Sequence, residues 1–157
     1  MGPGGGTVNL HGYVRLQTRN KSGLVTHEWE GSNLLCNAGV STLAAEISQT
    51  GYQYRTTFGA VGIGTGAPTD SDTTLAAEVA RAPVSAPVAS GDAWSWQFFF
   101  NPYSSTSSLD IYECGVFLAA TATANSGMLL DHIAQTTPLI EWNAGETLML
   151  QVTFTVS

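Results

Sequence analysis

Charged residues are scarce in this chain. Only 11% of its 157 residues are Asp, Glu, Lys or Arg, whereas an average globular protein has about 25%. The charges that are present sum to −7, and Lys21 is the single lysine. Binding to a phosphate backbone requires several cations on one face, so we expect no nucleic-acid partner.

Long apolar runs and secretory features are also missing. No stretch approaches the ~18 consecutive apolar residues of a membrane-spanning helix, so we expect no membrane partner. Residues 1–7, which begin MGPGGG, lack the basic and apolar regions of a signal peptide and predict a flexible arm. The sequence therefore predicts a soluble protein made in the cytoplasm, with a single domain over residues 8–157.

Cysteine and histidine are too few and too scattered for a metal centre. Cys36 and Cys114 both stand among apolar residues, which favours two buried thiols, although a disulfide between them stays open. A zinc site needs about four Cys or His ligands, and the three histidines show no paired spacing. We therefore predict no metal and no cofactor.

Alternation of apolar and polar residues is the dominant pattern that is present. It predicts strands at 8–18, 24–30, 58–64, 93–100, 109–120, 128–134 and 147–157, with a hairpin joining the first two. Trp94, Trp96 and Phe98 share one face of their strand, and Phe99 lies on the other. Pro83 and Pro87 exclude regular helix around them and favour an extended edge segment.

Two segments have a helical pattern. Residues 37–51 place apolar side chains on one helical face, with Asn37 as the N-cap and Gly51 just past the end. Residues 72–80 predict a short helical turn with Asp72 at its N-cap. Together with the strands, these patterns predict an all-β fold, a jelly-roll-like sandwich or barrel with one short amphipathic helix and a helical turn.

The stretch AVGIGTGAPTDSDTTLAAEVAR, residues 60–81, contains a loose G-x-G-x-x-A pattern typical of a pyrophosphate loop. Such a loop must join a strand to a helix in a βαβ unit, and the surrounding pattern has no such unit. Residues 80–91 also hold no carboxylate for a ribose. We therefore expect small residues that let a strand pack closely against its neighbour, and no nucleotide. A calcium site that uses Asp70 and Asp72 stays open.

Several acidic residues invite a functional interpretation. Glu78 and Arg81, three residues apart, predict a local ion pair. Glu113 stands in an otherwise apolar strand, where we expect it to satisfy a buried partner such as Arg81 or a backbone amide. A glycosidase pair drawn from Asp110, Glu113, Asp131 and Glu141 is a further alternative, but nothing in the spacing singles it out. We predict no enzymatic activity.

An ordered set of motifs resembles small structural proteins of tailed bacteriophages over residues 24–157. The set contains N-L and N-A-G before a helix, G-T-x-x-P with D-T-x-L and E-x-x-R, a later E-x-G-x-F strand and a closing A-G-E-T-L strand. In this chain the motifs fall on Asn33, Leu34, Asn37, Gly39, Gly64, Thr65, Pro68, Asp72, Thr73, Leu75, Glu78, Arg81, Glu113, Gly115, Phe117, Ala144, Gly145, Glu146, Thr147 and Leu148.

This resemblance implies a virion protein, either a head-decoration (cement) protein or a part of the tail fibre or tail tip. The short chain without a fibrous shaft favours decoration, which implies a homotrimer bound to the major capsid protein. Exposed aromatic residues would then be interface candidates: Trp29, Tyr103 and Trp142. The alternative is a receptor- or carbohydrate-binding module at a tail tip, in which the same aromatic side chains stack on sugar rings.

Overall fold

The computed structural model describes residues 9–47, 57–85 and 87–157. The predicted arm at residues 1–7 and the predicted helix terminator Gly51 lie outside these ranges. Within them the chain is mostly antiparallel β-structure with one short helix, which confirms the all-β prediction. In the same ranges, no helix has the length and apolar character needed to cross a membrane.

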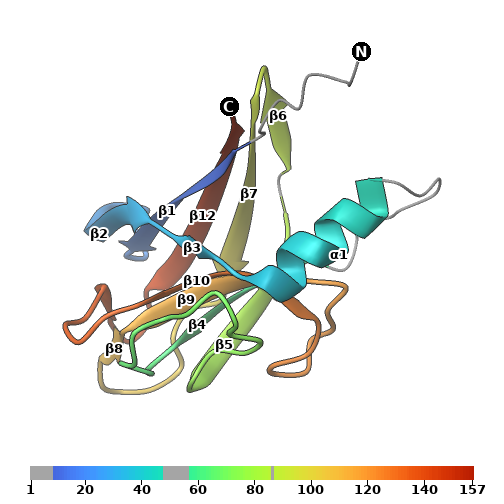
Figure 1. Cartoon of the computed structure of the whole chain (residues 1–157). Helices are drawn as coiled ribbons and strands as arrows, with labels where there is room; N and C mark the ends of the chain where they lie inside the picture. Colours follow the sequence, from blue (N-terminus) through green and yellow to red (C-terminus); the bar gives the residue numbers. More distant parts are fainter. Residues whose placement is uncertain (1–8, 48–56, 86) are drawn as a thin grey trace, which may run out of the picture.

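Five antiparallel strands form the first sheet, in the spatial order β2-β1-β12-β7-β6 (Figure 1). The predicted hairpin is confirmed, since β1 and β2 pair across the turn that follows Arg19. The closing strand β12 lies at the centre of the sheet between β1 and β7. The five strands are β1 (Leu10–Arg19), β2 (Val25–Ser32), β6 (Val88–Ser90), β7 (Ala93–Phe100) and β12 (Thr147–Val156).

The second sheet also has five strands, in the order β3-β10-β9-β4-β5. Its edge strand β5 ends at Pro83, which confirms the predicted edge segment, because proline has no N–H to donate to a further strand. The strands are β3 (Leu34–Leu35), β4 (Phe58–Gly62), β5 (Glu78–Pro83), β9 (Glu113–Leu118) and β10 (Met128–Ala134). A separate two-stranded sheet pairs β8 (Leu109–Ile111) with β11 (Ile140–Trp142).

The inner faces of the two sheets meet in one hydrophobic core, and Figure 1 shows their strands running in different directions. Leu16 and Phe98 enter this core from the first sheet, and Val116 and Leu130 enter it from the second. Burial of each such side chain contributes about 1.5–3 kcal/mol. Phe99 lies on the opposite face of β7 and is 55% exposed, as the period of two predicts.

The helix α1 (Asn37–Ile47) packs against β10 and β9. It begins at the predicted residue, but the Cys36 carbonyl accepts the first intrahelical hydrogen bond, so Cys36 and not Asn37 takes the N-cap position. Gly39 lies directly on β10, where a Cβ atom would come within 2.2 Å of Leu130 Cα. The glycine of the N-A-G motif therefore allows the helix to touch the strand backbone.

The helical turn predicted at 72–80 is wrong. Residues 70–77 form turns and bends, and β5 begins at Glu78. The alanine-rich segment has high helix propensity, but antiparallel pairing with β4 overrides it. A β-bulge leaves Val79 without a partner of its own in this pairing, because Ala80 and Glu78 face consecutive residues of β4.

Candidate functional site

Glu113, at the start of β9, is the centre of the largest buried polar site. Its side chain is fully buried, and its two oxygens accept hydrogen bonds from three backbone amides. The amides of Gly64 and Ala77 donate to Oε1 at 3.0 and 2.7 Å, and the amide of Ala76 donates to Oε2 at 3.0 Å. All three belong to the loop between β4 and β5, residues 63–77. One carboxylate therefore holds both ends of this loop.

The glycines of the G-x-G pattern make room for that carboxylate. A Cβ atom on Gly62 would lie 2.5 Å from Glu113 Oε1, and one on Gly64 would lie 2.6 Å from the same oxygen. The next glycine, Gly66, has open space around it. The pattern that is typical of a pyrophosphate loop thus brings backbone N–H groups against an anion that belongs to the protein itself.

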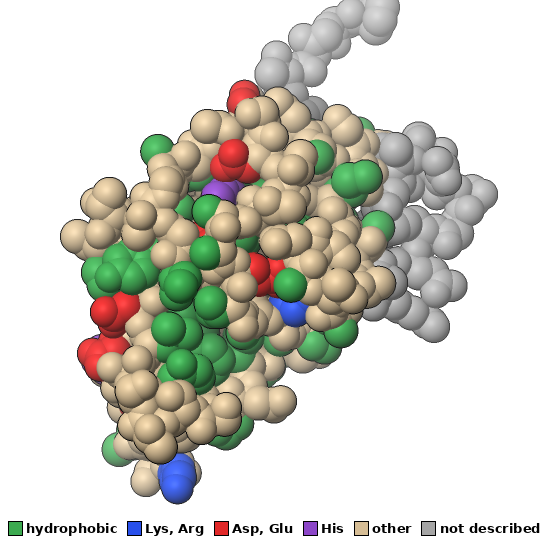
Figure 2. Space-filling model, turned by 90° about the horizontal axis from the view of Figure 1, so that it is seen from below, with side chains coloured by type: hydrophobic (Ala, Val, Ile, Leu, Met, Phe, Trp, Pro, Cys, Tyr) green, Lys and Arg blue, Asp and Glu red, His purple; other side chains and the backbone are tan. Residues whose placement is uncertain are grey.

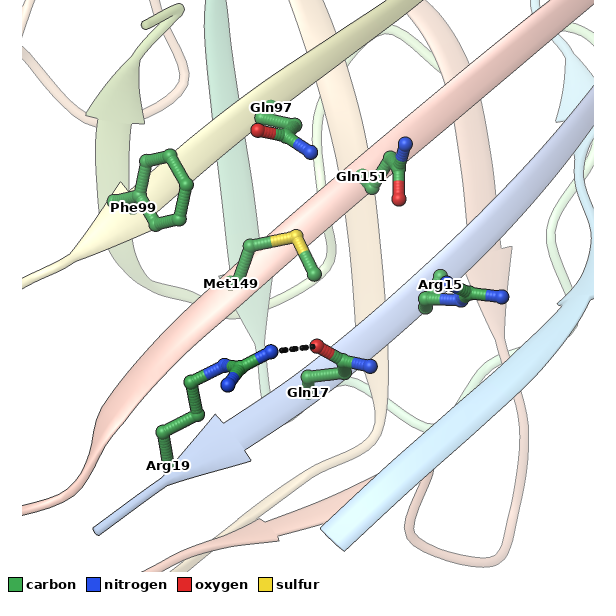
Figure 3. A pocket seen from close by; sticks show the side chains of 7 residues that line it. All are labelled: Arg15, Gln17, Arg19, Gln97, Phe99, Met149 and Gln151. Atoms are coloured by element: carbon green, nitrogen blue, oxygen red, sulfur yellow. Dashed lines mark hydrogen bonds between the residues drawn. The ribbon is translucent and has the colours of Figure 1, made fainter. Parts of the chain in front are cut away.

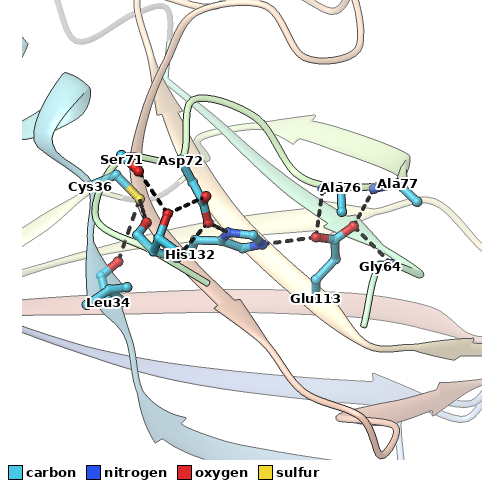
Figure 4. Close-up of polar contacts among 10 residues, drawn as sticks. Leu34, Cys36, Gly64, Ser71, Asp72, Ala76, Ala77, Glu113 and His132 are labelled. Carbon is cyan, nitrogen blue, oxygen red and sulfur yellow. Dashed lines mark hydrogen bonds and ion pairs between the residues drawn. The ribbon is translucent and has the colours of Figure 1, made fainter. Parts of the chain in front are cut away.

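His132, on β10, joins Glu113 to a second carboxylate (Figure 4). Its Nε2 lies 2.9 Å from Glu113 Oε2, and its Nδ1 lies 2.8 Å from Asp72 Oδ2. Asp72 also accepts hydrogen bonds from the backbone N–H and the hydroxyl of Thr69, at 2.9 and 2.7 Å. Asp72 therefore closes the loop through Thr69 and caps no helix. We call Asp72, His132 and Glu113 the His132 cluster.

The charges in the His132 cluster stabilise one another. Burial alone would raise the pKa of the Glu113 carboxyl, but the hydrogen bonds from His132 and the backbone amides outweigh it and lower that pKa. Burial lowers the pKa of His132, yet its bonds to Glu113 and Asp72 reverse the shift and leave the pKa raised. Burial opposes ionisation of Asp72 too, and its bonds from Thr69 and His132 leave its pKa lowered. All three shifts favour the charged forms, an imidazolium between two carboxylates.

This arrangement fastens a loop and has no free group for proton transfer. Both ring nitrogens of His132 are occupied by carboxylate oxygens. A general base needs one ring nitrogen directed at a substrate or a nucleophile. Within the described residues no group of three His, Cys, Asp or Glu side chains is placed to hold a metal ion. The loop is therefore bound to the second sheet by a fully paired buried network.

A second polar cluster lies on the same sheet, around Arg81. The expected ion pair is present, with Arg81 Nε 2.6 Å from Glu78 Oε1 and both side chains at most 5% exposed. The guanidinium also donates to the carbonyl of Thr121 at 2.8 Å and to the hydroxyl of Ser126 at 2.9 Å. Its carbon lies 4.7 Å above the centre of the Phe117 ring. Arg81 thus joins β5 to the turn between β9 and β10. Its partner is Glu78, and Glu113 is bonded instead to His132 and to backbone amides.

Asp131, next to His132 on β10, is a third buried acid. Its Oδ1 accepts the backbone N–H of Val116 at 2.7 Å, and its Oδ2 accepts the Asn33 amide at 2.5 Å. Burial raises its pKa to about 7, although both hydrogen bonds act in the opposite direction. The Asn33 Oδ1 atom is buried without a hydrogen-bond partner. A protonated Asp131 would present a donor beside it.

The three aromatic interface candidates differ in their exposure. Trp142 is only 4% exposed and donates its indole N–H to the carbonyl of Glu146 at 2.7 Å, so the expectation that it is a surface residue is wrong. Tyr103 is half-buried, and its ring lies 5.1 Å from that of Trp142. Trp29 is half-buried against the core. Trp142 is buried because it belongs to the hydrophobic core, where its ring lies between those of Phe100 and Tyr103 at 6.0 and 5.1 Å, and its own strand pattern does not predict these contacts.

The cysteines are buried free thiols, as favoured from the sequence. Burial raises the pKa of Cys36 to about 12, and burial raises the pKa of Cys114 as well. A thiol of this kind is a poor nucleophile, because the reactive form is the thiolate. Neither cysteine therefore forms a reactive pair with His132.

The four carboxylates of the glycosidase alternative lie in two settings. Glu113 and Asp131 are buried on neighbouring strands, and each has its own hydrogen-bond partners. Asp110 and Glu141 are directly opposite each other in the two-stranded sheet. The candidate calcium ligand Asp72 is committed to Thr69 and His132. A catalytic pair would need two carboxyl groups that face a common open space.

An apolar hollow lies beside the half-buried Tyr103. It measures about 370 Å³ and is lined by Val79 and Ala80 of β5, Leu109 of β8, Trp142 of β11, and Pro102, Tyr103 and Ser104. Figure 2, a view of the underside where β5 and β8 lie in Figure 1, shows hydrophobic side chains gathered in a patch. A partner side chain can enter a hollow of this kind.

Comparison of the chain with protein-family models, curated proteins and solved structures finds no match. The site is therefore defined by its own geometry. Sequence reasoning singled out Asp72, Glu78, Arg81 and Glu113, and the structure places all four in the two clusters on the second sheet. It missed His132, and it named Asp131 only as one of the four carboxylates of the glycosidase alternative. Their signal was two adjacent polar residues in the otherwise apolar run MLLDHIA.

Proposed function

We propose that this chain is a structural protein of a tailed-bacteriophage virion, a decoration (cement) protein that binds the major capsid protein and stabilises the head shell. In this proposal its two packed sheets are a variant of the jelly-roll sandwich, and several copies, most simply three, assemble at each site. In this proposal the protein stabilises the shell through its free energy of binding and catalyses no reaction.

The observation that carries the proposal is the convergence of the resembling motifs. Gly64, Asp72 and Glu113 come from separate motifs and lie in or against the His132 cluster. Glu78 and Arg81 form the second cluster on the same sheet. These residues therefore gather around one loop, whereas the closing A-G-E-T-L motif lies apart from them at the start of β12. Their gathering supports the proposed resemblance.

The filled polar sites also favour binding over catalysis. The acidic residues that the resemblance highlights use their hydrogen-bonding capacity on backbone amides, on Arg81 and on His132. They hold the 63–77 loop and the turn at 121–126 on the second sheet. A rigid, charge-poor surface supported from within suits a protein whose task is contact with another protein.

The apolar hollow is the proposed contact with the capsid. Val79 is 42% exposed at its rim, and the Tyr103–Trp142 aromatic pair forms its wall. Insertion of an apolar capsid side chain would bury this surface and add binding energy to the assembled shell. Tyr103 thus keeps the interface role expected for it, with Trp142 as its buried support.

The test uses heads of the virus that carries this gene, prepared without the protein. Added protein is expected to bind heads and to raise the temperature at which a dye reaches the packaged DNA. Val79→Asp should weaken binding about tenfold or more, because it places a charge in the apolar contact. Val88→Asp is the matched control, since Val88 is an exposed valine of β6 on the other sheet. Failure of the wild-type protein to bind heads would contradict the proposal.

Light scattering on a sizing column measures the solution mass. A trimer would support the proposed assembly. A monomer that forms trimers on heads would place the assembly step on the capsid, whereas a monomer that ignores heads would move the assignment to a tail-tip binding module. The outer face of the first sheet favours that second candidate, because it is open and rich in polar side chains.

A further inference from the structure

In the part of the chain that the structure describes, the outer face of the first sheet is open and has an ordered chemical pattern. The core takes the alternate residues Leu16, Phe98 and Leu150, so their neighbours along β1, β7 and β12 face outward. The strand register places these outward residues in three rows across the sheet: Gln17–Met149–Phe99, Arg15–Gln151–Gln97 and Tyr13–Thr153–Ser95.

A shallow hollow of about 360 Å³ lies on the first two rows (Figure 3). Its lining consists of three glutamines, two arginines, Phe99 and Met149. Arg15 and Gln151 also line a smaller hollow of about 140 Å³ with Tyr13 and Thr153. The two hollows therefore form one track along the sheet. The four residue-to-residue steps of β12 from Met149 to Thr153 correspond to about 13 Å.

The side chains in this track are mostly planar and polar. The amide groups of Gln97 and Gln151 each offer donors and an acceptor. Phe99 lines the same hollow and is 55% exposed. A sugar ring has hydroxyl groups on its rim and C–H groups on its faces. An exposed flat ring flanked by amides matches both features.

The track also carries most of the exposed positive charge. The cations that reach the surface of the described residues are Arg15, Arg19 and Lys21, on β1 and the turn after it. Arg15 is paired with Glu30 at 2.7 Å. Arg19 donates to the Gly23 carbonyl and to Gln17, and in the described part of the chain no carboxylate lies within ion-pair distance of it. Its guanidinium is therefore available to an external anion.

We propose that the outer face of the first sheet binds an oligosaccharide that bears a carboxylate. One sugar ring stacks on Phe99, and its hydroxyl groups bond to the amides of Gln97 and Gln151. The carboxylate pairs with Arg19. The chain of sugars then follows the track toward Thr153. A chain of net charge −7 repels free anions in general, so this local cation gives the site its selectivity.

A second copy of the chain fits this face less well. Only Phe99 and Tyr13 offer exposed apolar surface there, because Met149 is buried, whereas homodimer interfaces are about 65% apolar. The inference does not depend on attachment to the capsid, because the apolar hollow beside Tyr103 lies on other strands.

The test is an array of immobilised oligosaccharides that contains matched members with and without a uronic or sialic acid. We expect the full-length protein to bind acidic members and to discriminate against their neutral counterparts. The best acidic member is then titrated in solution. Arg19→Gln should weaken binding about tenfold and remove the preference for the acid. Lys21→Gln, two residues away and outside the hollow, should change the affinity less than about twofold.

Phe99→Ala should also weaken binding about tenfold, and Phe99→Tyr should retain it because the ring is kept. Unfolding temperatures and solution masses of all variants exclude general loss of structure. Absence of binding to every member, equal binding of acidic and neutral members, or insensitivity to both Arg19→Gln and Phe99→Ala would overturn the proposal. A lower solution mass of Phe99→Ala would overturn it in favour of a second copy on this face.

Discussion

The two sheets of this protein have outer faces of opposite character. The outer face of the second sheet is covered by the 63–77 loop. Buried charged side chains lie between this loop and the sheet. The first sheet leaves glutamine, threonine and arginine side chains on an open face. Both sheets have five antiparallel strands, so the strands themselves do not set the difference.

The difference between the two outer faces follows from the length of the connections between neighbouring strands. β1 and β2 are joined by a tight turn, whereas the connection from β4 to β5 is long enough to fold back over its own sheet. A covering loop removes water from polar groups, and each must then have a partner inside the protein. The His132 cluster, the Arg81 cluster and the three amides on Glu113 meet that requirement. On the open face, solvent can hydrogen-bond to the polar side chains, so these side chains stay available to a ligand.

The largest effect is expected from changing the centre of the covered face. Glu113→Gln leaves the imidazolium of His132 without one of its anions and turns an amide N–H₂ toward backbone donors. We expect a loss of about 3–5 kcal/mol in the free energy of unfolding, measured by urea denaturation. Glu30→Gln is the control, because Glu30 pairs with Arg15 at the surface, where solvent screens the ion pair and the loss should be far smaller. Equal losses for the two variants would mean that burial does not matter here.

The pH dependence of stability should also originate in the covered face. Asp131 binds a proton more tightly in the folded state, with a pKa of about 7 against an ordinary 3.8, so its contribution to stability falls as pH rises from about 4 to 7. The raised pKa of His132 acts in the same direction above its ordinary 6.5. The lowered pKa values of Glu113 and Asp72 make stability fall below about pH 4.5. Maximum stability is therefore expected near pH 4.5, where the losses due to Glu113 and Asp72 have ended and the decline due to Asp131 has only begun.

Asp131→Asn isolates the first of these contributions. The variant cannot bind the extra proton. Its free energy of unfolding, measured from pH 4 to 8, should therefore lose most of the decline that the wild type shows above about pH 5. The absolute stability can change in either direction because Asn also alters the bonds to Asn33 and Val116. An unchanged slope would show that Asp131 is already ionised throughout this range.

A smaller effect is expected from the glycines of the 63–77 loop. Gly64→Ala forces a methyl group to within 2.6 Å of Glu113 Oε1 and of Ala76 Cβ, and should cost about 1–3 kcal/mol. Gly66→Ala, in the same loop, meets no atom within 4 Å and should be neutral or stabilise by a few tenths of a kcal/mol. Thermal unfolding of both variants distinguishes close packing around Glu113 from a general need for flexibility, which would make the two losses similar.

Several elements of the fold could be anticipated from local pattern, but the organisation of the covered face could not. The period of two located β1, β7 and β12, and the helical period located α1, because each pattern is set within one segment. The helix predicted at 72–80 failed because pairing with β4, which is distant in the pattern, overrode alanine propensity. His132 was missed because its two partners, Asp72 in the 63–77 loop and Glu113 on β9, are distant in sequence and only the folded chain brings them to β10.

The smallest effect is expected on the open face. Gln151→Ala removes an amide that is half exposed at the centre of the track and has apolar core residues only on the other side of its strand. Its unfolding free energy should stay within about 0.5 kcal/mol of the wild type, while affinity for the bound oligosaccharide falls. A loss of stability comparable to that of Gly64→Ala would show that this face is supported from within, as the covered face is. A neutral result separates the two faces: the covered one uses its polar groups for stability, and the open one holds them for a ligand.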